Sequence, residues 1–219
     1  MLRLLFEKKG NAVWISHLDL MRLFQRSFKR AGLALTHTKG FNPRPSVSIA
    51  LPLSVGVQSH CELLDFELEG MDVSYEEIRC KLNENLVDGI EVLQVYPNGK
   101  KINELAFLNC NVTMEFDCGV PEAAVDQIKE LFGREELLVS KKSKSGMTEQ
   151  NIIPMIQSIS VQQTDDHTVT LEACICCQNP SLNPMQLAAA VQRYLPELES
   201  DYVYCSRLEI FDRNHNVFR

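Results

Sequence analysis

The fold of this chain is set by a stretch near its amino end, which reads RLLFEKKGNAVWISHLDLMRLFQRSFKRAG (residues 3–32). Residues 3–8 have the composition of a short strand, and the Gly10-Asn11 pair is typical of a turn. Ser16 is a good helix cap, and Asp19 three residues later completes a capping-box pattern. Gly32 stands where a helix commonly ends. The stretch therefore predicts a strand, a turn and a helix that ends near residue 31.

The predicted helix has two unlike faces. The residues expected to face the core are Leu20, Phe24, Phe28 and Ala31, which recur at helical spacing. The opposite face carries the cations Arg22, Arg26, Lys29 and Arg30. Asp19 is the only acid within the helix, so these cations are not paired along it. We interpret the basic face as a candidate phosphate-binding surface, although an ordinary solvated helix face has the same pattern.

Further elements follow in an order that repeats. In the first half the predicted strands are 33–36, 47–51, 63–68 and 90–96, and a second helix covers about 74–86. In the second half the predicted strands are 110–116, 137–139, 155–162, 169–176 and 203–211, with helices at 121–132 and 184–195. Each half thus reads β-α-β-β-β-α-β. This order predicts an α+β protein of two tandem ferredoxin-like (split β-α-β) units with antiparallel sheets, at residues 1–98 and 105–219.

Charge is distributed unevenly along the chain. The first fifty residues contain nine lysines and arginines against two acids, Glu7 and Asp19, although the formal net charge of the whole chain is −7. The other 169 residues therefore sum to −14. A basic end on an acidic chain attracts phosphates locally, which is typical of a protein that binds nucleic acid or another phosphate-rich partner.

The composition also excludes several classes of protein. The first ten residues contain no apolar run long enough for a secretory signal, and no stretch approaches the ~18 apolar residues of a membrane span. We expect a cytoplasmic protein with no membrane partner, whose eight cysteines remain reduced. The cluster Cys174, Cys176 and Cys177 lacks companion ligands, which favours buried structural thiols. Since no glycine-rich phosphate loop is present either, we predict no metal and no cofactor.

Two basic segments are candidates for contact with nucleic acid. The first, residues 38–45, reads TKGFNPRP, and within it Lys39 and Arg44 could contact phosphates while Phe41 stacks on a base. The alternative for Phe41 is burial in the core. The second segment lies at the corresponding position of the other half and contains Lys141, Lys142 and Lys144. Together with the helix cations, these residues form the predicted nucleic-acid-binding set.

Histidines and carboxylates offer alternative chemistry. His17 and His37 could act as acid and base in metal-independent RNA cleavage, although His17 could equally fix the start of the helix. Asp65, Glu67 and Glu69 alternate along one predicted strand. They could hold a divalent ion, but a solvated strand face opposite Leu64 and its apolar neighbours is the favoured interpretation.

Four segments of the first half carry a family resemblance: RLLFEK (residues 3–8), ISHLDLMR (15–22), GFNPRP (40–45) and IALPLSVG (49–56). They resemble the bacterial radical-SAM-linked domain of unknown function, found alone or fused behind a radical S-adenosylmethionine (SAM) protein. In that family a histidine usually stands where this chain has Asn42. In the second half the similarity is limited to Lys141-Lys142 and residues 205–207.

The resemblance implies partnership with a radical SAM enzyme, and the family's genomic neighbours include ribosome and RNA-processing genes. This chain lacks the Cys-x-x-x-Cys-x-x-Cys cluster that such an enzyme requires, so we expect an accessory module rather than an enzyme. The leading hypothesis is a non-catalytic protein that binds tRNA or rRNA and acts with a separate radical SAM enzyme. The alternatives are an endoribonuclease that uses His17 and His37, and an adaptor that binds the radical SAM protein directly.

Overall fold

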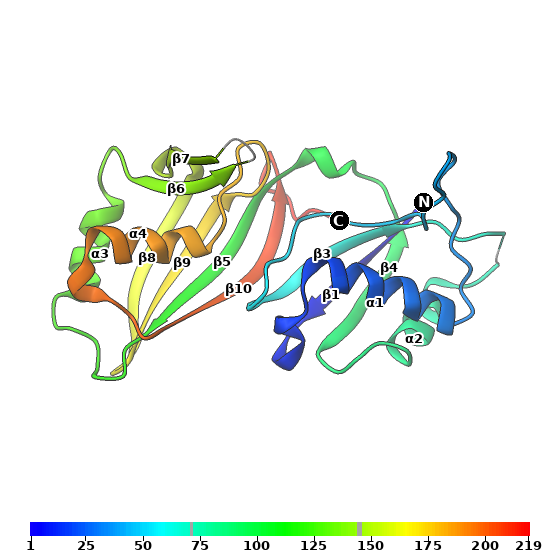
Figure 1. Cartoon of the computed structure of the whole chain (residues 1–219), viewed down its shortest axis with the longest axis horizontal. Coiled ribbons are helices and arrows are strands. Elements are labelled where there is room, and N and C mark those ends of the chain that lie inside the picture. The colour runs from blue at the N-terminus through cyan, green and yellow to red at the C-terminus, as the bar shows by residue number, and fades with distance from the viewer. Residues whose placement is uncertain (71, 144–145) are drawn as a thin grey trace. The chain divides into compact units, whose positions relative to one another are not determined.

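The computed structural model describes residues 1–70, 72–143 and 146–219. Within these ranges the chain is an α+β protein with a mostly antiparallel sheet and four α-helices (Figure 1), which confirms the predicted class. Its residues divide into two compact units, 1–104 together with 217–219, and 105–216. No helix in the described ranges is both long and apolar enough to cross a bilayer.

The first unit contains the elements β1 (Leu2–Lys8), α1 (His17–Arg30), β2 (Val47–Ile49), β3 (Val57–Phe66), α2 (Tyr75–Asn83) and β4 (Ile90–Pro97). Its strands pair in the order β4-β1-β3, and β2 pairs with the end of β3. The segment predicted as a strand at 33–36 forms only an isolated bridge, Leu35 to Leu68. This unit therefore has one strand fewer than the sequence pattern indicated.

Helix α1 begins and ends where the sequence predicts. The Ser16 hydroxyl accepts a hydrogen bond from the Asp19 backbone amide at 3.2 Å, which caps the first turn. Gly32 follows the helix with φ of +70°, a conformation that glycine adopts without strain. Phe24 packs edge to face on Phe6 of β1, with ring centroids 4.8 Å apart. The apolar face of α1 is thus fixed against the sheet, and the basic face points away from it.

One prediction about the first unit is wrong. Asp65 was expected on a solvated face, but it is buried and accepts hydrogen bonds from Arg3 Nε at 2.6 Å and Arg3 Nη2 at 3.0 Å. The cause is tertiary, because Asp65 on β3 lies directly across from Arg3 on β1, which is itself fully buried, and Asn98 Nδ2 donates to Asp65 Oδ2 at 3.0 Å. Of the other two acids in that run, Glu67 and Glu69 are exposed as expected.

The second unit contains β5 (Leu105–Glu115), α3 (Ala124–Phe132), β6 (Leu138–Ser143), β7 (Gly146–Asn151), β8 (Ile156–Asp165), β9 (Thr168–Cys176), α4 (Met185–Tyr194) and β10 (Tyr202–Asp212). Four of its strands form a sheet in the order β10-β5-β9-β8, while β6 and β7 pair with each other. Strand β7 was not predicted, because its sequence GMTEQN is polar and lacks apolar alternation.

Some of the cysteines of the second unit are buried and others are not. Cys177 and Cys205 are buried, and burial raises the pKa of the Cys177 thiol to about 12 and that of Cys205 to about 11. These two thiols therefore remain protonated at neutral pH. Cys174 and Cys176 are only partly buried, so the predicted burial of the whole cluster holds for Cys177 alone.

Candidate nucleic-acid interface

Six cations of the first unit form what we call the basic surface: Arg22, Arg26, Lys29, Arg30, Lys39 and Arg44. All six are exposed. The other three cations among the first fifty residues are used within the fold. Arg3 pairs with buried Asp65, buried Lys8 donates to the Ile15 carbonyl at 2.9 Å, and Lys9 forms ion pairs with Glu7 and Glu91. One third of the nine cations counted in the sequence is therefore not available to a partner.

The cations on α1 have little local compensation. Arg22 pairs with Asp19 at 2.8 Å, but both side chains are more than half exposed. Hydrogen bonds from Ser16 and from Arg22 lower the pKa of the Asp19 carboxyl, so it is ionised at neutral pH. Within the described residues, Arg26, Lys29 and Arg30 form no ion pair. Lys29 and Arg30 lie in the last turn of α1, where positive charge also complements the helix dipole.

The loop that carries the other two cations is closed by its own backbone. The Thr38 amide donates to the Arg44 carbonyl at 2.8 Å, and the Arg44 amide donates to Thr38 Oγ1 at 3.0 Å. Phe41 lies between these closing residues and is fully exposed, so the alternative that it packs in the core is wrong. The loop presents an aromatic ring between two exposed cations, Lys39 and Arg44, which is a suitable arrangement for stacking on an unpaired base.

A groove of about 600 Å³ brings the helix and the loop together. Its lining includes one cation from each, Arg22 and Arg44, and the apolar residues Leu18, Met21, Pro45, Val47 and Ile49. The remaining lining residues are His17, Gln25 and Ser48. Two separate basic features of the sequence therefore meet at one concave site, with guanidinium groups beside an apolar wall. Such a site can take a phosphate and the flat face of a base together.

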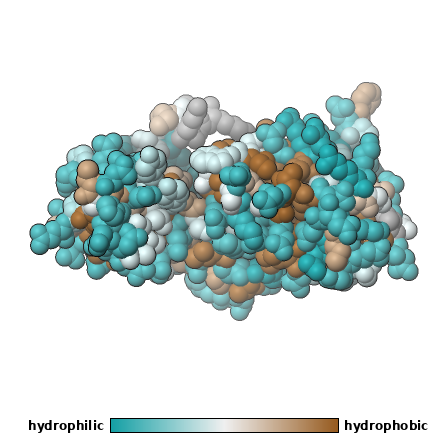
Figure 2. Space-filling model, turned by 90° about the horizontal axis from the view of Figure 1, so that it is seen from below, coloured by the Kyte–Doolittle hydropathy of each residue, from teal (hydrophilic) through white to brown (hydrophobic). Residues whose placement is uncertain are grey.

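The apolar part of this site was not found from the sequence. Leu18 is 67% exposed and Trp14, four residues before it, is 69% exposed, although both are large apolar residues. Figure 2 shows one face of the molecule, on which apolar residues form patches within a mostly hydrophilic surface. The available signal was that Leu18, which lines the groove, falls outside the helical spacing of the predicted core.

The two candidate catalytic histidines are placed differently. His17 is the first residue of α1 and lines the groove, and its Nδ1 atom is buried without a hydrogen-bond partner among the described residues. It therefore does not supply the hydrogen bond proposed to fix the helix start through that atom. His37 is exposed, forms a bridge with Pro45 through the backbone, and does not line the groove.

The second predicted basic segment belongs to the second unit. Lys141 lies on β6 and its ammonium group donates to the Ser181 carbonyl at 3.3 Å. Lys142 also lies on β6, where its backbone pairs with Met147. Lys144 lies outside the described residues. The ammonium group of Lys141 is thus partly engaged within the unit.

Acidic residues lie close to the base of the loop. The Thr36 amide donates to the Glu67 carbonyl at 2.9 Å, and Thr36 Oγ1 donates to the Glu67 carboxylate at 3.2 Å. Because Glu67 is exposed, its carboxylate reduces the positive potential at this end of the loop. The most favourable position for a phosphate is therefore toward α1, at the groove.

Comparison with known proteins places the chain in a family. The model of the family described as "uncharacterized protein conserved in bacteria" (DUF2344) matches residues 1–184. The chain belongs to this family. Comparison of this DUF2344 member with curated proteins gives no match.

Solved structures resemble this DUF2344 member in fold. A chain from the crystal structure of a Cbf5-Nop10-Gar1 complex is similar with a TM-score of 0.51 and 10% identity, over 95% of this chain and 48% of that one. The chain thus spans about half the length of that relative. An unknown protein from Galdieria sulphuraria matches at 8% identity and a TM-score of 0.26, covering 94% of this chain and 96% of its own. The TM-score of 0.26 is too low to support an argument. At 10% identity, the first similarity concerns the fold alone.

Proposed function

We propose that this protein is a cytoplasmic, non-catalytic RNA-binding accessory protein that presents a tRNA or rRNA segment to a separate radical SAM enzyme. The observation that carries the proposal is the groove that Arg22 and Arg44 both line. Beside it lie further exposed cations of α1 and a fully exposed phenylalanine, Phe41. Phosphate contacts, an apolar wall and a stacking ring are the features that single-stranded RNA requires.

The architecture supports the proposal at the level of fold. We infer that both units are ferredoxin-like, because the first has the strand order β4-β1-β3-β2 and the second β10-β5-β9-β8. In each unit these strands alternate with two helices in the split β-α-β sequence. In the second unit the hairpin β6-β7 is an addition to this plan.

Partnership with a radical SAM enzyme is supported by the sequence resemblance. The four segments that carry it contribute seven of the ten residues that line the groove: His17, Leu18, Met21, Arg22, Arg44, Pro45 and Ile49. The residues that define the resemblance are therefore concentrated at the site that we propose for RNA. Lys141, Lys142 and Lys144 are proposed as additional phosphate contacts from the second unit.

RNA retention on a filter tests the proposal. Wild-type protein is expected to retain total tRNA and rRNA at ~50 mM salt, with a log–log salt slope near −4 if about six phosphates of a single strand are contacted. The variant Arg22→Glu, Arg26→Glu, Arg44→Glu should lose affinity by roughly 100-fold or more, because three contacts become repulsive. Circular dichroism should show an unchanged fold, since all three side chains are exposed.

A matched control reverses three exposed cations elsewhere. Lys101→Glu, Lys129→Glu, Arg213→Glu changes the net charge by the same amount but leaves the groove intact. Its affinity should fall far less than that of the groove variant. Equal losses in the two variants would show that only net charge matters, and a wild-type protein that retains no RNA at ~50 mM salt, where phosphate contacts are strong, would refute the proposal.

Two further measurements separate the alternatives. If the protein is an endoribonuclease, cleavage persists in chelator and is lost in His17→Ala; the proposal predicts no cleavage in either protein. If it is a protein adaptor, affinity purification recovers the radical SAM enzyme equally with and without ribonuclease treatment. An RNA-bridged partner is lost on digestion, which is the outcome that the proposal predicts.

A further inference from the structure

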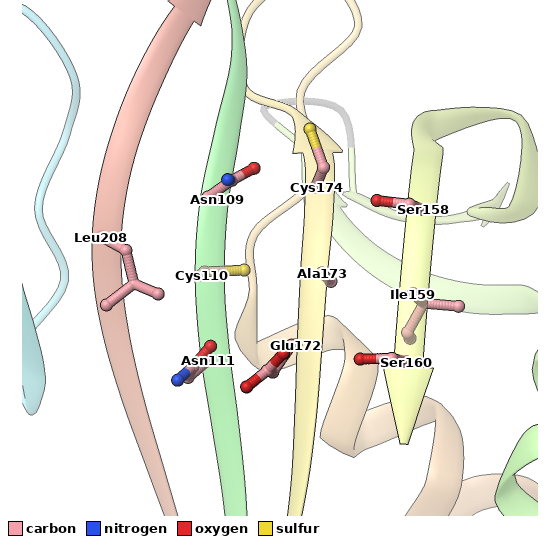
Figure 3. Close-up of a pocket in the computed structure, with 10 residues that line it drawn as sticks. All are labelled: Asn109, Cys110, Asn111, Ser158, Ile159, Ser160, Glu172, Ala173, Cys174 and Leu208. Carbon is pink, nitrogen blue, oxygen red and sulfur yellow. The ribbon is translucent and has the colours of Figure 1, made fainter. Parts of the chain in front are cut away.

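A second concave site lies on the sheet of the second unit, and it differs from the groove in chemistry (Figure 3). Its volume is about 360 Å³. The polar side chains that line it are Asn109, Asn111, Ser158, Ser160, Glu172 and Cys174. On the opposite face of the sheet, α3 contacts β8 and α4 contacts β5, and side chains such as Val112 and Leu171 are buried. The pocket therefore occupies the face of the sheet opposite α3 and α4.

Strand register arranges the six polar residues in two rows. Asn109 on β5 pairs with Cys174 on β9, which pairs with Ser158 on β8. Two residues further along β5, Asn111 pairs with Glu172 on β9, which pairs with Ser160 on β8. Neighbouring strands lie about 4.8 Å apart, and residues two apart on a strand share a face, so the rows form a patch about 10 Å by 7 Å. These dimensions are large enough for a planar bicyclic ring.

The charges at the pocket select the kind of ligand. Among the described residues that line it, Glu172 is the only charged one, and no lysine or arginine contributes. A phosphate or carboxylate ligand would therefore be repelled, whereas a ligand with N–H donors would be attracted. Gln162 Nε2 donates to one Glu172 oxygen at 3.2 Å, and the exposed carboxylate has capacity for further donors.

The pocket also contains an unsatisfied polar atom. Asn111 Oδ1 is buried and, within the part of the chain that the structure describes, accepts no hydrogen bond. Buried acceptors without a donor are uncommon, since leaving one unpaired is costly. Asn111 lies directly across the strand from Glu172. A ligand that donates to Glu172 would therefore lie next to the Asn111 amide.

We infer that this pocket binds a guanine base. Guanine presents an N1–H and an amino group side by side, and a carboxylate accepts both in a bidentate arrangement, as Glu172 is placed to do. The amides of Asn109 and Asn111 supply both donors and acceptors for the base's remaining edge, and the two serine hydroxyls supply more. Cytosine and adenine each offer one amino group to the carboxylate, and uracil offers one N3–H, so none of these bases presents two adjacent donor groups.

The inference is independent of the proposed function, because guanosine carries no phosphate and the basic surface is not involved. The test is a titration of the full-length protein with guanosine, cytidine, adenosine and uridine, followed by amide chemical shifts. Guanosine should shift amides of residues 109–111, 158–160 and 172–174 and bind most tightly. Absence of these shifts at ~10 mM guanosine, a concentration that reveals even weak binding, or equal binding of uridine would overturn the inference.

Two substitutions sharpen the test. Glu172→Gln keeps the shape but replaces one acceptor oxygen by a donor, and it should weaken guanosine binding by roughly 10-fold or more. Glu122→Gln removes the same charge from an exposed residue outside the pocket and should have no effect. Should Glu172→Gln prove unstable, Asn111→Ala provides a second variant, which is expected to weaken guanosine binding as well. Unchanged affinity in a folded pocket variant would contradict the site.

The guanine could belong to a free nucleoside or to an RNA strand. The pentanucleotides UUGUU and UUUUU distinguish these sources. If the base comes from RNA, UUGUU binds more tightly than guanosine, because the flanking nucleotides add contacts. If it comes from a nucleoside, UUGUU and guanosine bind equally. If UUUUU shifted the amides of residues 109–111 as much as UUGUU does, guanine recognition would be refuted.

Discussion

The two units of this chain have opposite charge. The first carries 14 lysines and arginines against 13 acids, a net charge of +1, whereas the second carries 8 against 16, a net charge of −8. The charges at the two concave sites differ in the same sense. The groove of the first unit is lined by Arg22 and Arg44. In the sheet pocket of the second unit, Glu172 is the only charged residue among the described lining residues. Two units with the same order of sheet strands thus present concave sites of opposite charge, because the strand order does not fix which side chains line a site.

The largest expected difference between the units concerns the buried ion pair of the first. Asp65→Ala leaves the Arg3 guanidinium uncompensated in the interior and should lower the free energy of unfolding by about 3–5 kcal/mol. Urea denaturation measures this loss. Hydrogen exchange should locate the destabilisation in β1 and β3, with the second unit unaffected.

The exposed pair between Arg79 and Glu76 is the matched control for Asp65→Ala. Both partners are partly solvated, so Glu76→Ala should destabilise much less. If both substitutions had equally small effects, the Arg3–Asp65 pair would not be a structural element of the first unit.

An aromatic substitution compares the units as RNA-binding surfaces. Phe41→Ala should cost about 1–3 kcal/mol of RNA-binding free energy, the usual value for loss of one stacked base, without changing stability because the ring is fully exposed. Tyr202→Ala removes an exposed ring from the second unit and is the control. A Phe41→Ala variant that binds as tightly as wild type in a filter assay would exclude stacking on this ring.

Two equivalent helix caps separate stability from binding. The hydroxyls of Ser16 and Ser74, at the starts of α1 and α2, each accept a hydrogen bond at 3.2 Å from the backbone amide three residues later. Each Ser→Ala substitution should cost about 1 kcal/mol of stability by thermal denaturation. Only Ser16→Ala should also weaken RNA binding, because α1 positions His17 and Arg22 at the groove. If both substitutions weakened RNA binding equally, the loss of binding would follow from the loss of stability alone.

The smallest expected effect concerns single phosphate contacts. Arg44→Ala should reduce the magnitude of the log–log salt slope by about 0.7, the value for one phosphate of a single strand. Lys141→Ala should change the slope less, because its ammonium group already donates to the Ser181 carbonyl. A larger effect of Lys141→Ala would move the centre of RNA binding to the second unit.

Much of the fold could be predicted from local patterns. Capping by Ser16, the stop at Gly32 and the apolar spacing of Leu20, Phe24 and Phe28 depend on residues a few positions apart, and the structure contains all of them. The strand at 33–36 and the unpredicted β7 were misjudged, because pairing with a distant segment decides whether an extended stretch becomes a strand.

The site was predicted only in part. Arg22 and Arg44 were recognised because charge is visible in the sequence, but their shared groove depends on how the loop folds back along α1. The role of Leu18 and Val47 in its apolar wall was not visible, since a sequence does not show which apolar residues remain uncovered. The burial of Asp65 likewise depends on its partner Arg3, 62 residues away in the sequence.

The helices, most of the strands and the unequal distribution of charge could be predicted without coordinates, because each depends on intrinsic properties of residues and their near neighbours. Which cations remain available and which are used inside the protein depends on the folded chain. Arg3 and Arg44 have the same side chain, yet one is fully buried beside a carboxylate and the other is exposed. The physical reason is that the free energy of a charge depends on its distance from water and from opposite charge, and the folded chain sets both distances.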